Sequence, residues 1–303
     1  MKVFTLKANE NWHSDVYREE WKRNAKDYHT EDINEADVLW LLPAWKWREV
    51  PAQYLIHKKI IVTVHHIVPK KFNKQGFLQR DQFVDKYHVP CRKTYDFVSQ
   101  HTKKPIEIIG YWLNREAWSP LDRKECRNSL GLPQNKFIVG SFQRDTEGHD
   151  LKTPKLEKGP DIFVECVKNL KKEKGNLCIL LGGWRRQYII KKLEEEGIDY
   201  IYKELAPQEE LKKMYASCDL YVVSSRFEGG PQAIIEAAAM RVPVISTDVG
   251  VARDILSENC VFDITQKTYF PTKEDVETSY KKVLEHNISD HIEKYVNFFK
   301  SCV

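Results

Sequence analysis

The sequence predicts an α/β protein with two doubly wound parallel sheets, one in each half, that face each other across a cleft. Three observations support this prediction. Short apolar segments alternate with amphipathic ones from about Lys136 onward, the same alternation is fainter before residue 110, and the composition changes between the halves. Apolar strands that alternate with amphipathic helices are typical of a parallel sheet covered on both faces. Ligands of such sheets bind beyond the carboxyl ends of the strands.

The second half carries the clearer pattern. Ile162, Phe163 and Val167 lie at helical spacing after Pro160, and proline suits the first turn of a helix. Short runs rich in β-branched residues indicate strands. The expected strands are residues 137–140, 177–181, 200–202, 220–224 and 244–246, and the expected helices are residues 160–172, 186–196, 208–217 and 231–240.

The first half repeats this pattern more weakly. Its expected strands are residues 3–6, 38–42, 60–64, 96–99 and 106–109, and its expected helices are residues 12–25 and 47–56. At the end of the sequence, Ile292, Tyr295, Val296 and Phe299 mark an amphipathic helix over residues 288–303.

A shift in composition indicates where the two domains divide. Seven of the eight tryptophans precede residue 119, whereas eleven of the thirteen glycines follow residue 130. Glycine permits tight turns and close backbone approach, which the second half therefore needs more. Residues 114–122 have turn chemistry and no strong periodicity. We expect one domain over residues 1–120, a second over residues 121–285, and a helix within residues 286–303 that packs back toward the first domain.

Composition excludes several classes of protein. No apolar run reaches the roughly 20 residues that cross a bilayer, and the first residues suggest a strand rather than a signal peptide. The seven cysteines are scattered without a Cys-x-x-Cys pair, which indicates reduced thiols in a cytoplasmic protein. The net charge of +4 suits anionic ligands and allows peripheral contact with the inner membrane face. No basic stripe or reading motif indicates nucleic acid.

The clearest chemical motif is the segment SSRFEGGPQAIIE at residues 224–236. A strand ends, two glycines allow close backbone approach, and a helix begins with free N–H groups, which together form a cradle for a phosphate or diphosphate. Glu236 lies where it could bond a ribose, and Glu228 could accept hydrogen bonds from sugar hydroxyls. Without further context, a flexible helix entry with Glu236 as a surface carboxylate explains the segment equally well.

The residues around this motif resemble a known family. The continuation AAAMRVPVIS, the preceding strand SCDLYVVSS, the glycine turn LGG at residues 181–183 and the segment GSFQR followed by Lys158-Gly159 are similar to the family-4 retaining glycosyltransferases, also called glycosyl transferases group 1, which have the GT-B fold with two Rossmann-like domains. This resemblance implies a donor domain in the second half and an acceptor-side domain in the first. The donor-binding residues that it implies are Gly182, Gly183, Ser225, Gly229, Gly230, Pro231 and Glu236.

Four residues are implied as catalytic by the resemblance, namely His65, Arg144, Lys158 and Glu228. In the family, the two cations contact the donor diphosphate. Physically, fixed cations stabilise the negative charge that develops on a leaving nucleoside diphosphate. Residues 145–157 form a longer loop than is usual for the family, which leaves Lys152 and Lys155 as substitutes for Arg144.

The first half departs from the family pattern at two places. His65 ends an apolar strand at the position of the family histidine beside the donor sugar, but the acid that usually follows is replaced by His66. The usual glycine-rich turn after the first strand is missing, because Gly76 is the first glycine. Asn11, Trp12 and His13 in that loop become acceptor-side candidates together with His66.

Three tryptophans allow a second interpretation. Trp40, Trp45 and Trp47 could stack on sugars, although packing in the core or between domains is the more common role of such side chains.

The sequence therefore predicts a retaining glycosyltransferase that moves a sugar from a nucleotide-diphospho-sugar to a hydroxyl acceptor on a glycan, lipid or small molecule. The co-substrate is a UDP-, GDP- or ADP-linked sugar, and no other cofactor is expected. No Asp-x-Asp motif occurs, so no metal is expected either. The alternatives are a non-catalytic module that binds sugar nucleotides and another GT-B enzyme such as a sugar-nucleotide epimerase.

Overall fold

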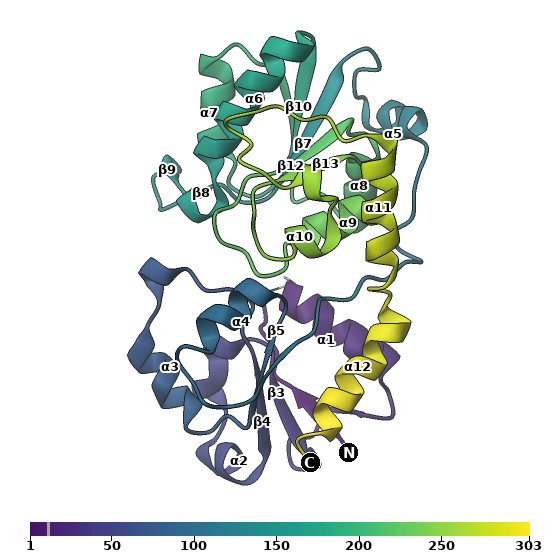
Figure 1. Ribbon diagram of the computed structural model, residues 1–303. Helices are drawn as coiled ribbons and strands as arrows, with labels where there is room; N and C mark the ends of the chain where they lie inside the picture. The colour runs from purple at the N-terminus through teal and green to yellow at the C-terminus, as the bar shows by residue number, and fades with distance from the viewer. Residues whose placement is uncertain (11–12) are drawn as a thin grey trace. The chain divides into compact units, whose positions relative to one another are not determined.

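The computed structural model describes residues 1–10 and 13–303, which divide into two compact units (Figure 1). Unit 1 comprises Met1–Trp112 together with His286–Val303, and unit 2 comprises Leu113–Glu285. Each unit has its own parallel β-sheet, of six and five strands respectively in the described residues. The predicted α/β class with two doubly wound sheets is confirmed.

The sheet of unit 1 has the strand order β2-β1-β3-β4-β5-β6, and all of its pairings are parallel. Its strands are β1 (Val3–Thr5), β2 (His29–Thr30), β3 (Val38–Leu41), β4 (Lys59–Thr63), β5 (Lys86–Val89) and β6 (Ile106–Ile108). Alternate residues of a strand point to opposite faces, so Leu39 and Leu41 meet one layer of helices and Trp40 meets the other.

Helices cover both faces of this sheet (Figure 1). The helices of unit 1 are α1 (His13–Asn24), η1 (Ala44–Glu49), α2 (Ala52–His57), η2 (Pro69–Lys71), α3 (Lys74–Asp81), α4 (Arg92–Val98) and α12 (Ile288–Lys300). Leu55, Phe77 and Val98 bring α2, α3 and α4 onto the core at one face. Helices α1 and α12 contact each other at the opposite face.

Aromatic rings fill the layer between the sheet and the α1–α12 pair. Trp21 and Trp40 are fully buried and cross nearly at right angles, with ring centroids 5.8 Å apart. Phe299 of α12 lies 5.3 Å from Trp21 and 5.1 Å from Trp40, and Tyr295 lies 4.9 Å from Trp112. Large rings bury more apolar surface than any other side chains, so α12 is a structural part of unit 1.

The sheet of unit 2 has the strand order β11-β10-β7-β12-β13, again entirely parallel. Its strands are β7 (Phe137–Phe142), β10 (Leu177–Gly183), β11 (Tyr200–Glu204), β12 (Leu220–Val223) and β13 (Val244–Ser246). A separate antiparallel hairpin consists of β8 (Thr146–Glu147) and β9 (Thr153–Pro154), so the charged loop at residues 145–157 has a structure of its own.

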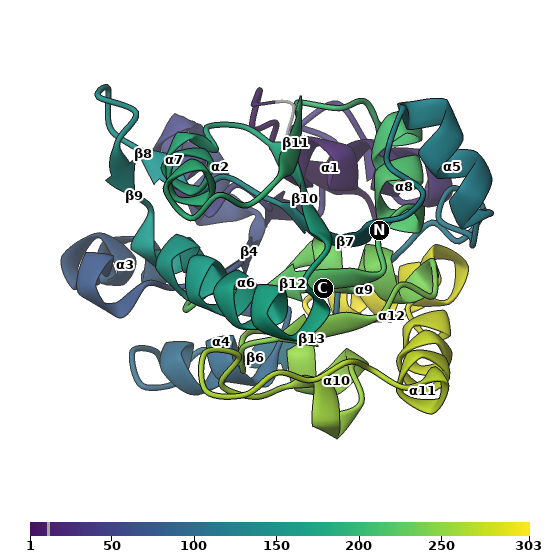
Figure 2. The same ribbon diagram turned by 90° about the horizontal axis from the view of Figure 1, so that it is seen from above.

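Figure 2 shows helices on both sides of the unit 2 sheet, with α6 and α7 on one side and α5, α8 and α9 on the other. The helices are α5 (Arg123–Leu130), η3 (Leu156–Lys158), α6 (Pro160–Lys174), α7 (Gln187–Glu195), α8 (Gln208–Ala216), α9 (Gln232–Ala239), α10 (Ala252–Ile255), η4 (Glu258–Cys260) and α11 (Lys273–Leu284). Phe163, Val167 and Leu193 pack with strand residues in a hydrophobic core.

Two predictions of elements in unit 1 were wrong. The strand expected at residues 96–99 belongs to α4, and the strand in this region is β5, at Lys86–Val89. The helix expected at residues 47–56 is two short helices, η1 and α2, separated by Val50 and Pro51. Val50 has extended backbone angles, as residues before proline usually do, and this ends the first helix.

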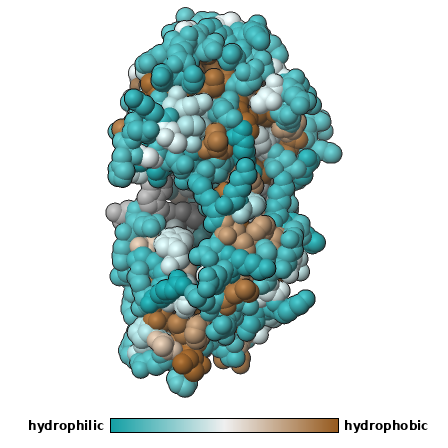
Figure 3. All heavy atoms as spheres, turned by 90° about the vertical axis from the view of Figure 1, so that its left-hand side faces the viewer, coloured by the Kyte–Doolittle hydropathy of each residue, from teal (hydrophilic) through white to brown (hydrophobic). Residues whose placement is uncertain are grey.

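One face of the molecule is mostly hydrophilic, with hydrophobic side chains in small, scattered groups (Figure 3). Within residues 1–10 and 13–303, no helix has the length and apolar character that crossing a membrane requires.

Candidate functional site

The loop between β12 and α9 is held in a fixed course by close backbone contacts. Thr247 Oγ1 donates a hydrogen bond to the carbonyl of Ser225 at 2.6 Å. A Cβ atom on Gly250 would lie 2.2 Å from the carbonyl oxygen of Gly229, so only glycine fits there. Pro231 stands at the N-cap position of α9. The loop Gly229-Gly230-Pro231 therefore leads directly into the N-terminus of that helix.

A lysine–glutamate ion pair lies at the centre of this region. Lys158 Nζ is paired with Glu228 Oε1, and both side chains are largely buried. Ser225 Oγ lies 3.2 Å from the same carboxylate oxygen and 3.3 Å from Gln143 Oε1. The amide of Gln143 donates to the carbonyl of Lys158 at 3.0 Å. Three segments of unit 2 thus converge on one charged pair.

Gly159 allows Lys158 to approach β12. Its φ is +60°, and a Cβ atom there would lie 1.8 Å from the carbonyl oxygen of Ser224. The backbone N–H groups of Arg226 and Phe227 donate to the carbonyl of Glu157, at 2.8 and 3.2 Å. Glycine is thus required for the contact that places Lys158 beside Glu228.

Glu236 lies on α9 and is half-buried. The hydroxyl of the buried Tyr215 donates to its Oε2 at 2.9 Å. Burial of the ring raises the pKa of Tyr215, and the nearby charge of Glu236 raises it further. The carboxylate is therefore positioned by α8 and is not a freely solvated surface group.

Arg144 follows β7 and is held in place by its neighbours. Its Nε donates to the carbonyl of Thr146 at 3.0 Å, and its guanidinium lies 5.2 Å from the ring centroid of Trp184. Burial lowers the pKa of Lys155, and the charges of Lys158 and Arg144 lower it further, against the opposing effect of Glu157. Lys158 and Arg144 therefore each lie close enough to Lys155 to repel it, whereas Lys152 is exposed on the hairpin.

A buried ion pair joins the ends of β7 and β10. Arg186 and Asp145 are both fully buried, and Arg186 also donates to the carbonyl of Gly182 at 2.6 Å and to the carbonyl of Ser141. Gly183 has φ +92°, and a Cβ atom there would lie 2.9 Å from the carbonyl oxygen of Gln143. The sequence analysis missed this pair. Its only signals were a charged loop and an arginine directly before a helix, both of which usually lie at the surface.

His65 in unit 1 has both ring nitrogens occupied. Nε2 lies 2.9 Å from the carbonyl oxygen of Leu42, and Nδ1 contacts the hydroxyl of Tyr111. Because a carbonyl can only accept, Nε2 carries the proton and Nδ1 accepts from Tyr111. Burial lowers the pKa of His65 to about 4, so the ring is neutral near pH 7. His66 is exposed.

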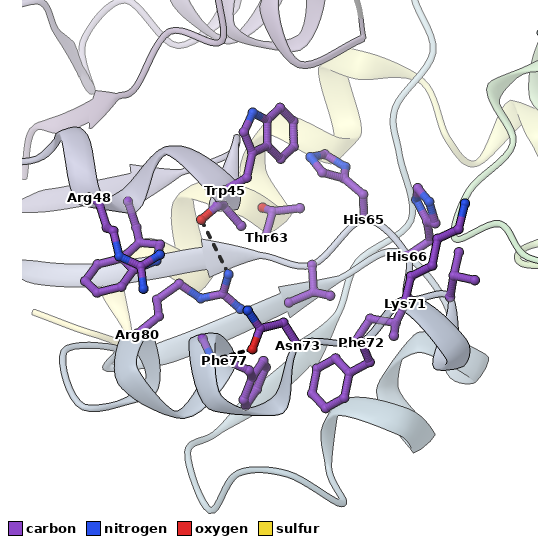
Figure 4. Close-up of a pocket in the computed structure, with 16 residues that line it drawn as sticks. Trp45, Arg48, Thr63, His65, His66, Lys71, Phe72, Asn73, Phe77 and Arg80 are labelled. Atoms are coloured by element: carbon purple, nitrogen blue, oxygen red, sulfur yellow. Dashed lines mark hydrogen bonds between the residues drawn. The ribbon is translucent and has the colours of Figure 1, made fainter. Parts of the chain in front are cut away.

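A pocket of about 480 Å³ opens beside these histidines at the carboxyl end of β4 (Figure 4). Its wall includes Thr63, His65 and His66 from the β4 segment, residues of η1, and residues of α3. A pocket at this edge of a parallel sheet is in the usual position of ligand sites in such folds.

Residues 6–10, which follow β1, take their course without a glycine. Asn9 takes the left-handed conformation with φ +57°, which asparagine tolerates better than other side chains. The carboxylate of Asp15 accepts from the backbone N–H groups of Ala8 and Glu10 at 2.9 and 2.8 Å. Asn11 and Trp12 lie outside the described residues, and His13 is the first residue of α1.

The three tryptophans of the sequence analysis differ in their environments. Trp40 is fully buried in the aromatic layer, where Nε1 donates to Thr63 Oγ1 at 2.8 Å, and this confirms its structural role. Trp45 is 52% exposed, and both Trp45 and Trp47 line the pocket. Among the described residues, no group of three or more His, Cys, Asp or Glu side chains could hold a metal ion.

Comparison with known sequences shows the family to which the chain belongs. The sequence model described as glycosyl transferases group 1 matches residues 122–295, which is more than half of the chain. The chain belongs to this family. The curated relatives of this group 1 glycosyltransferase are considerably longer than the chain itself. Alpha-galactosylglucosyldiacylglycerol synthase of Streptococcus pneumoniae (strain ATCC BAA-255 / R6) is 27% identical over 169 residues, which cover 52% of this chain and 41% of that protein.

A second relative of this group 1 glycosyltransferase is the lipopolysaccharide core biosynthesis mannosyltransferase LpsB of Rhizobium meliloti (strain 1021). It is 25% identical over 161 residues, which cover 50% of this chain and 43% of that protein. The chain therefore spans less than half the length of these curated relatives.

Solved structures resemble this group 1 glycosyltransferase over its whole length. HepE of Anabaena, in complex with UDP and glucose, has a TM-score of 0.78 at 12% identity, with 99% of each chain covered. Sucrose-phosphate synthase from Thermosynechococcus elongatus has a TM-score of 0.67 at 14% identity, covering 95% of this chain and 77% of that one. These likenesses establish the GT-B fold.

Proposed function

We propose that this protein is a retaining glycosyltransferase that moves a sugar from a UDP-, GDP- or ADP-linked donor to a hydroxyl acceptor. Residues 121–285 would form the donor domain and residues 1–120 the acceptor-side domain, with the helix in residues 286–303 packing back toward the latter. The convergence of Lys158, Glu228 and Ser225 between the end of β12 and the start of α9 carries the proposal. Family membership and the complex of HepE with UDP and glucose support it.

The donor diphosphate would lie at the N-terminus of α9, beside Arg144 and Lys158. The dipole of a helix attracts a phosphate group to its N-terminus, and Gly229, Gly230 and Pro231 keep bulky side chains away from the approach. Gly182 and Gly183 end β10 at the same edge of the sheet. Glu236, positioned by Tyr215, would accept a hydrogen bond from the ribose.

The ion pair suggests how the donor is recognised. Without a donor, Lys158 and Glu228 neutralise each other. A diphosphate offers Lys158 a second anionic partner, and this frees Glu228 to accept hydrogen bonds from the sugar hydroxyls. Each charge then has a new partner in the complex, so neither is left buried and unpaired.

Transfer with retention would follow from the position of the leaving group. In a front-face displacement, the acceptor oxygen attacks the anomeric carbon while the leaving phosphate oxygen takes the acceptor proton. Arg144, Lys158 and the α9 N-terminus stabilise the charge that develops on the phosphate, so no metal is required. His65 is neutral and both its nitrogens are occupied, so it would position the sugar without acting as a base.

The acceptor would be a carbohydrate or a lipid-linked molecule. The names of the two curated relatives concern a glycolipid and a lipopolysaccharide core, which supports this class. Activity at the cytoplasmic side, with peripheral contact at the inner membrane face, is consistent with a lipid-linked acceptor and with the net charge of +4.

The decisive experiment measures donor binding and nucleotide release together. The protein is titrated with UDP-, GDP- and ADP-glucose by calorimetry, and nucleotide release is then measured with and without candidate acceptors. Glu228→Ala should reduce transfer by at least about 100-fold while the fold remains intact. The matched control is Glu210→Ala, since Glu210 pairs with Lys203 at 3.3 Å in the same unit.

Each outcome distinguishes the candidates. Donor binding without turnover would indicate a non-catalytic sugar-nucleotide module, and release of nucleotide without transfer to any acceptor would favour an epimerase-like enzyme. Equal activity of Glu228→Ala and Glu210→Ala would refute the assigned site.

A further inference from the structure

The pocket in unit 1 has an unusual charge. Among its lining residues are two arginines, Arg48 and Arg80, but no aspartate or glutamate. The arginines come from two separate elements, η1 and α3. A concave site lined by charges of one sign concentrates ligands of the opposite sign.

The two arginines have only neutral partners. Arg80 Nη1 reaches the carbonyl of Ala44 at 3.4 Å, and its buried Nε has no hydrogen-bond acceptor. Arg48 donates to the amide oxygen of Gln79 at 2.6 Å. Neither arginine pairs with a carboxylate anywhere in residues 1–10 or 13–303. Figure 4 shows Arg80 extending from α3 toward η1, where a dashed line marks its bond to the carbonyl of Ala44.

Aromatic rings form the other part of the wall. Trp45, Trp47, Phe72 and Phe77 line the pocket, and the guanidinium of Arg80 lies 5.3 Å from the ring centroid of Phe77. Flat ring faces suit the apolar face of a sugar or a comparable ring. The pocket therefore combines a surface for a ring with donors for an anion.

We propose that this pocket binds the acceptor through a negatively charged group, a phosphate or a carboxylate, carried by the ring that presents the hydroxyl. The inference rests on the proposed function, because it takes the occupant of the pocket to be the acceptor. The planar forks of Arg80 and Arg48 match the paired oxygens of either group. His65 at the wall is in contact with the same space, so the ring of the acceptor is held beside it.

The first test compares charged and neutral probes in the absence of donor. Calorimetry is carried out with p-nitrophenyl β-D-glucuronide against p-nitrophenyl β-D-glucoside, and with glucose 6-phosphate against glucose. We expect at least about tenfold tighter binding of one charged probe than of its neutral partner, weakening as salt is raised. The stronger of the two pairs identifies carboxylate or phosphate. Equal affinities within both pairs, including no binding at all, would overturn the proposal.

The second test assigns the preference to the pocket. Arg80→Gln should abolish the preference for the charged probe and Arg80→Lys should restore part of it. Arg92→Gln is the matched control, since Arg92 is exposed on α4 and pairs with Asp96 outside the pocket. A preference unchanged in Arg80→Gln would overturn the assignment. If that variant does not fold, Arg48→Gln is measured in its place, and the salt dependence of the wild-type protein remains informative.

Failure of this inference can be told apart from failure of the proposed function. The wild-type protein is also titrated with UDP-, GDP- and ADP-glucose. Donor binding without any charge preference refutes the anionic acceptor alone, whereas a charge preference without donor binding refutes the transferase.

Discussion

Different kinds of chemical groups lie at the carboxyl edges of the sheets in the two units. In unit 2 the edge is made by backbone, with glycines at closest approach and one lysine–glutamate pair between them. In unit 1 it is made by aromatic rings and by the imidazole of His65, whose two nitrogens are occupied. Nine of the ten histidines lie in unit 1, whereas eleven of the thirteen glycines lie in unit 2.

This difference explains why the site in unit 2 is easier to predict from the sequence than the pocket in unit 1. A diphosphate binds to N–H groups, so a site for it requires glycines at fixed positions along the chain, and these are visible as a motif. A pocket made of side chains requires only that residues from several elements meet. Its signal is spread over a long sequence distance, as with Arg48 and Arg80.

The largest effect should follow from adding one methyl group to unit 2. Gly159→Ala places a Cβ atom 1.8 Å from the carbonyl oxygen of Ser224, which forces the backbone apart, and should cost more than about 4 kcal/mol of unfolding free energy. Gly197→Ala is the control, because Gly197 has φ +57° with no atom within 4 Å of the added Cβ. Its cost should be about 1 kcal/mol, the penalty for positive φ alone. Urea unfolding measures both, and equal costs would contradict the close-contact argument.

The next effect concerns the buried ion pair. Asp145→Asn leaves the charge of Arg186 buried without a counter-ion, and should cost about 3 to 5 kcal/mol. Asp161→Asn breaks a pair of the same type with Arg226, whose side chains are 39% and 36% exposed, and should cost about 1 kcal/mol or less. Unfolding in urea compares the two variants. A loss for Asp145→Asn as small as that for Asp161→Asn would show that water reaches the pair.

Acid should destabilise unit 1 more than unit 2. Burial is the main cause that lowers the pKa of His65 and His88 to about 4 and that of His291 to about 3. The unfolded chain therefore binds more protons than the folded one below about pH 6.5, so the stability that these residues contribute is complete above that pH and is lost as the pH falls toward 4.

Between pH 7 and pH 5 we expect a loss of about 2 kcal/mol for each of the fully buried His88 and His291, and less for His65. Urea unfolding followed by tryptophan fluorescence measures it, since six of the eight tryptophans lie in unit 1. A stability that does not change over this range would show that the imidazoles are hydrated.

The smallest change in unfolding free energy is expected for Trp45, in contrast to Trp40 five positions earlier in the chain. Trp45→Ala should change the unfolding free energy by no more than about 0.5 kcal/mol, because the ring is 52% exposed. Trp40→Ala should cost about 3 to 5 kcal/mol, because that ring is buried among Trp21 and Phe299. A large loss for Trp45→Ala would mean that the pocket wall is part of the core.

The sequence was sufficient for the fold class and for most elements of unit 2, because long periodic helices alternate there with apolar strands. In unit 1 it failed at residues 96–99, where the two apolar residues Phe97 and Val98 fit a strand and a helix equally well. The strand β5, with the sequence Lys-Tyr-His-Val, was missed because half of its residues are polar. His88 on that strand is nevertheless buried, with its nitrogens 2.9 Å from Thr63 Oγ1 and 2.8 Å from the carbonyl oxygen of Ile109.

Of the candidate site, the sequence indicated Lys158, Glu228 and Ser225, which the fold brings together. The catalytic roles of Lys158 and Glu228 and the donor-binding role of Ser225 remain predictions. The sequence did not indicate Gln143, Asp145 or Arg186, since a buried polar group is recognised by its partners and those are distant in sequence. Nor did it indicate how the loop after β1 dispenses with glycine, because that depends on Asp15 reaching back to the N–H groups of Ala8 and Glu10.

The late position of α12 in the chain has a consequence for synthesis. Unit 2 is continuous, so it can fold as soon as its residues have left the ribosome, whereas unit 1 must wait for Ile288–Lys300. Until then Trp21, Trp40 and Trp112 lack the rings of Tyr295 and Phe299 that cover them. The nascent first unit thus lacks the aromatic cover of α12 throughout translation of the second.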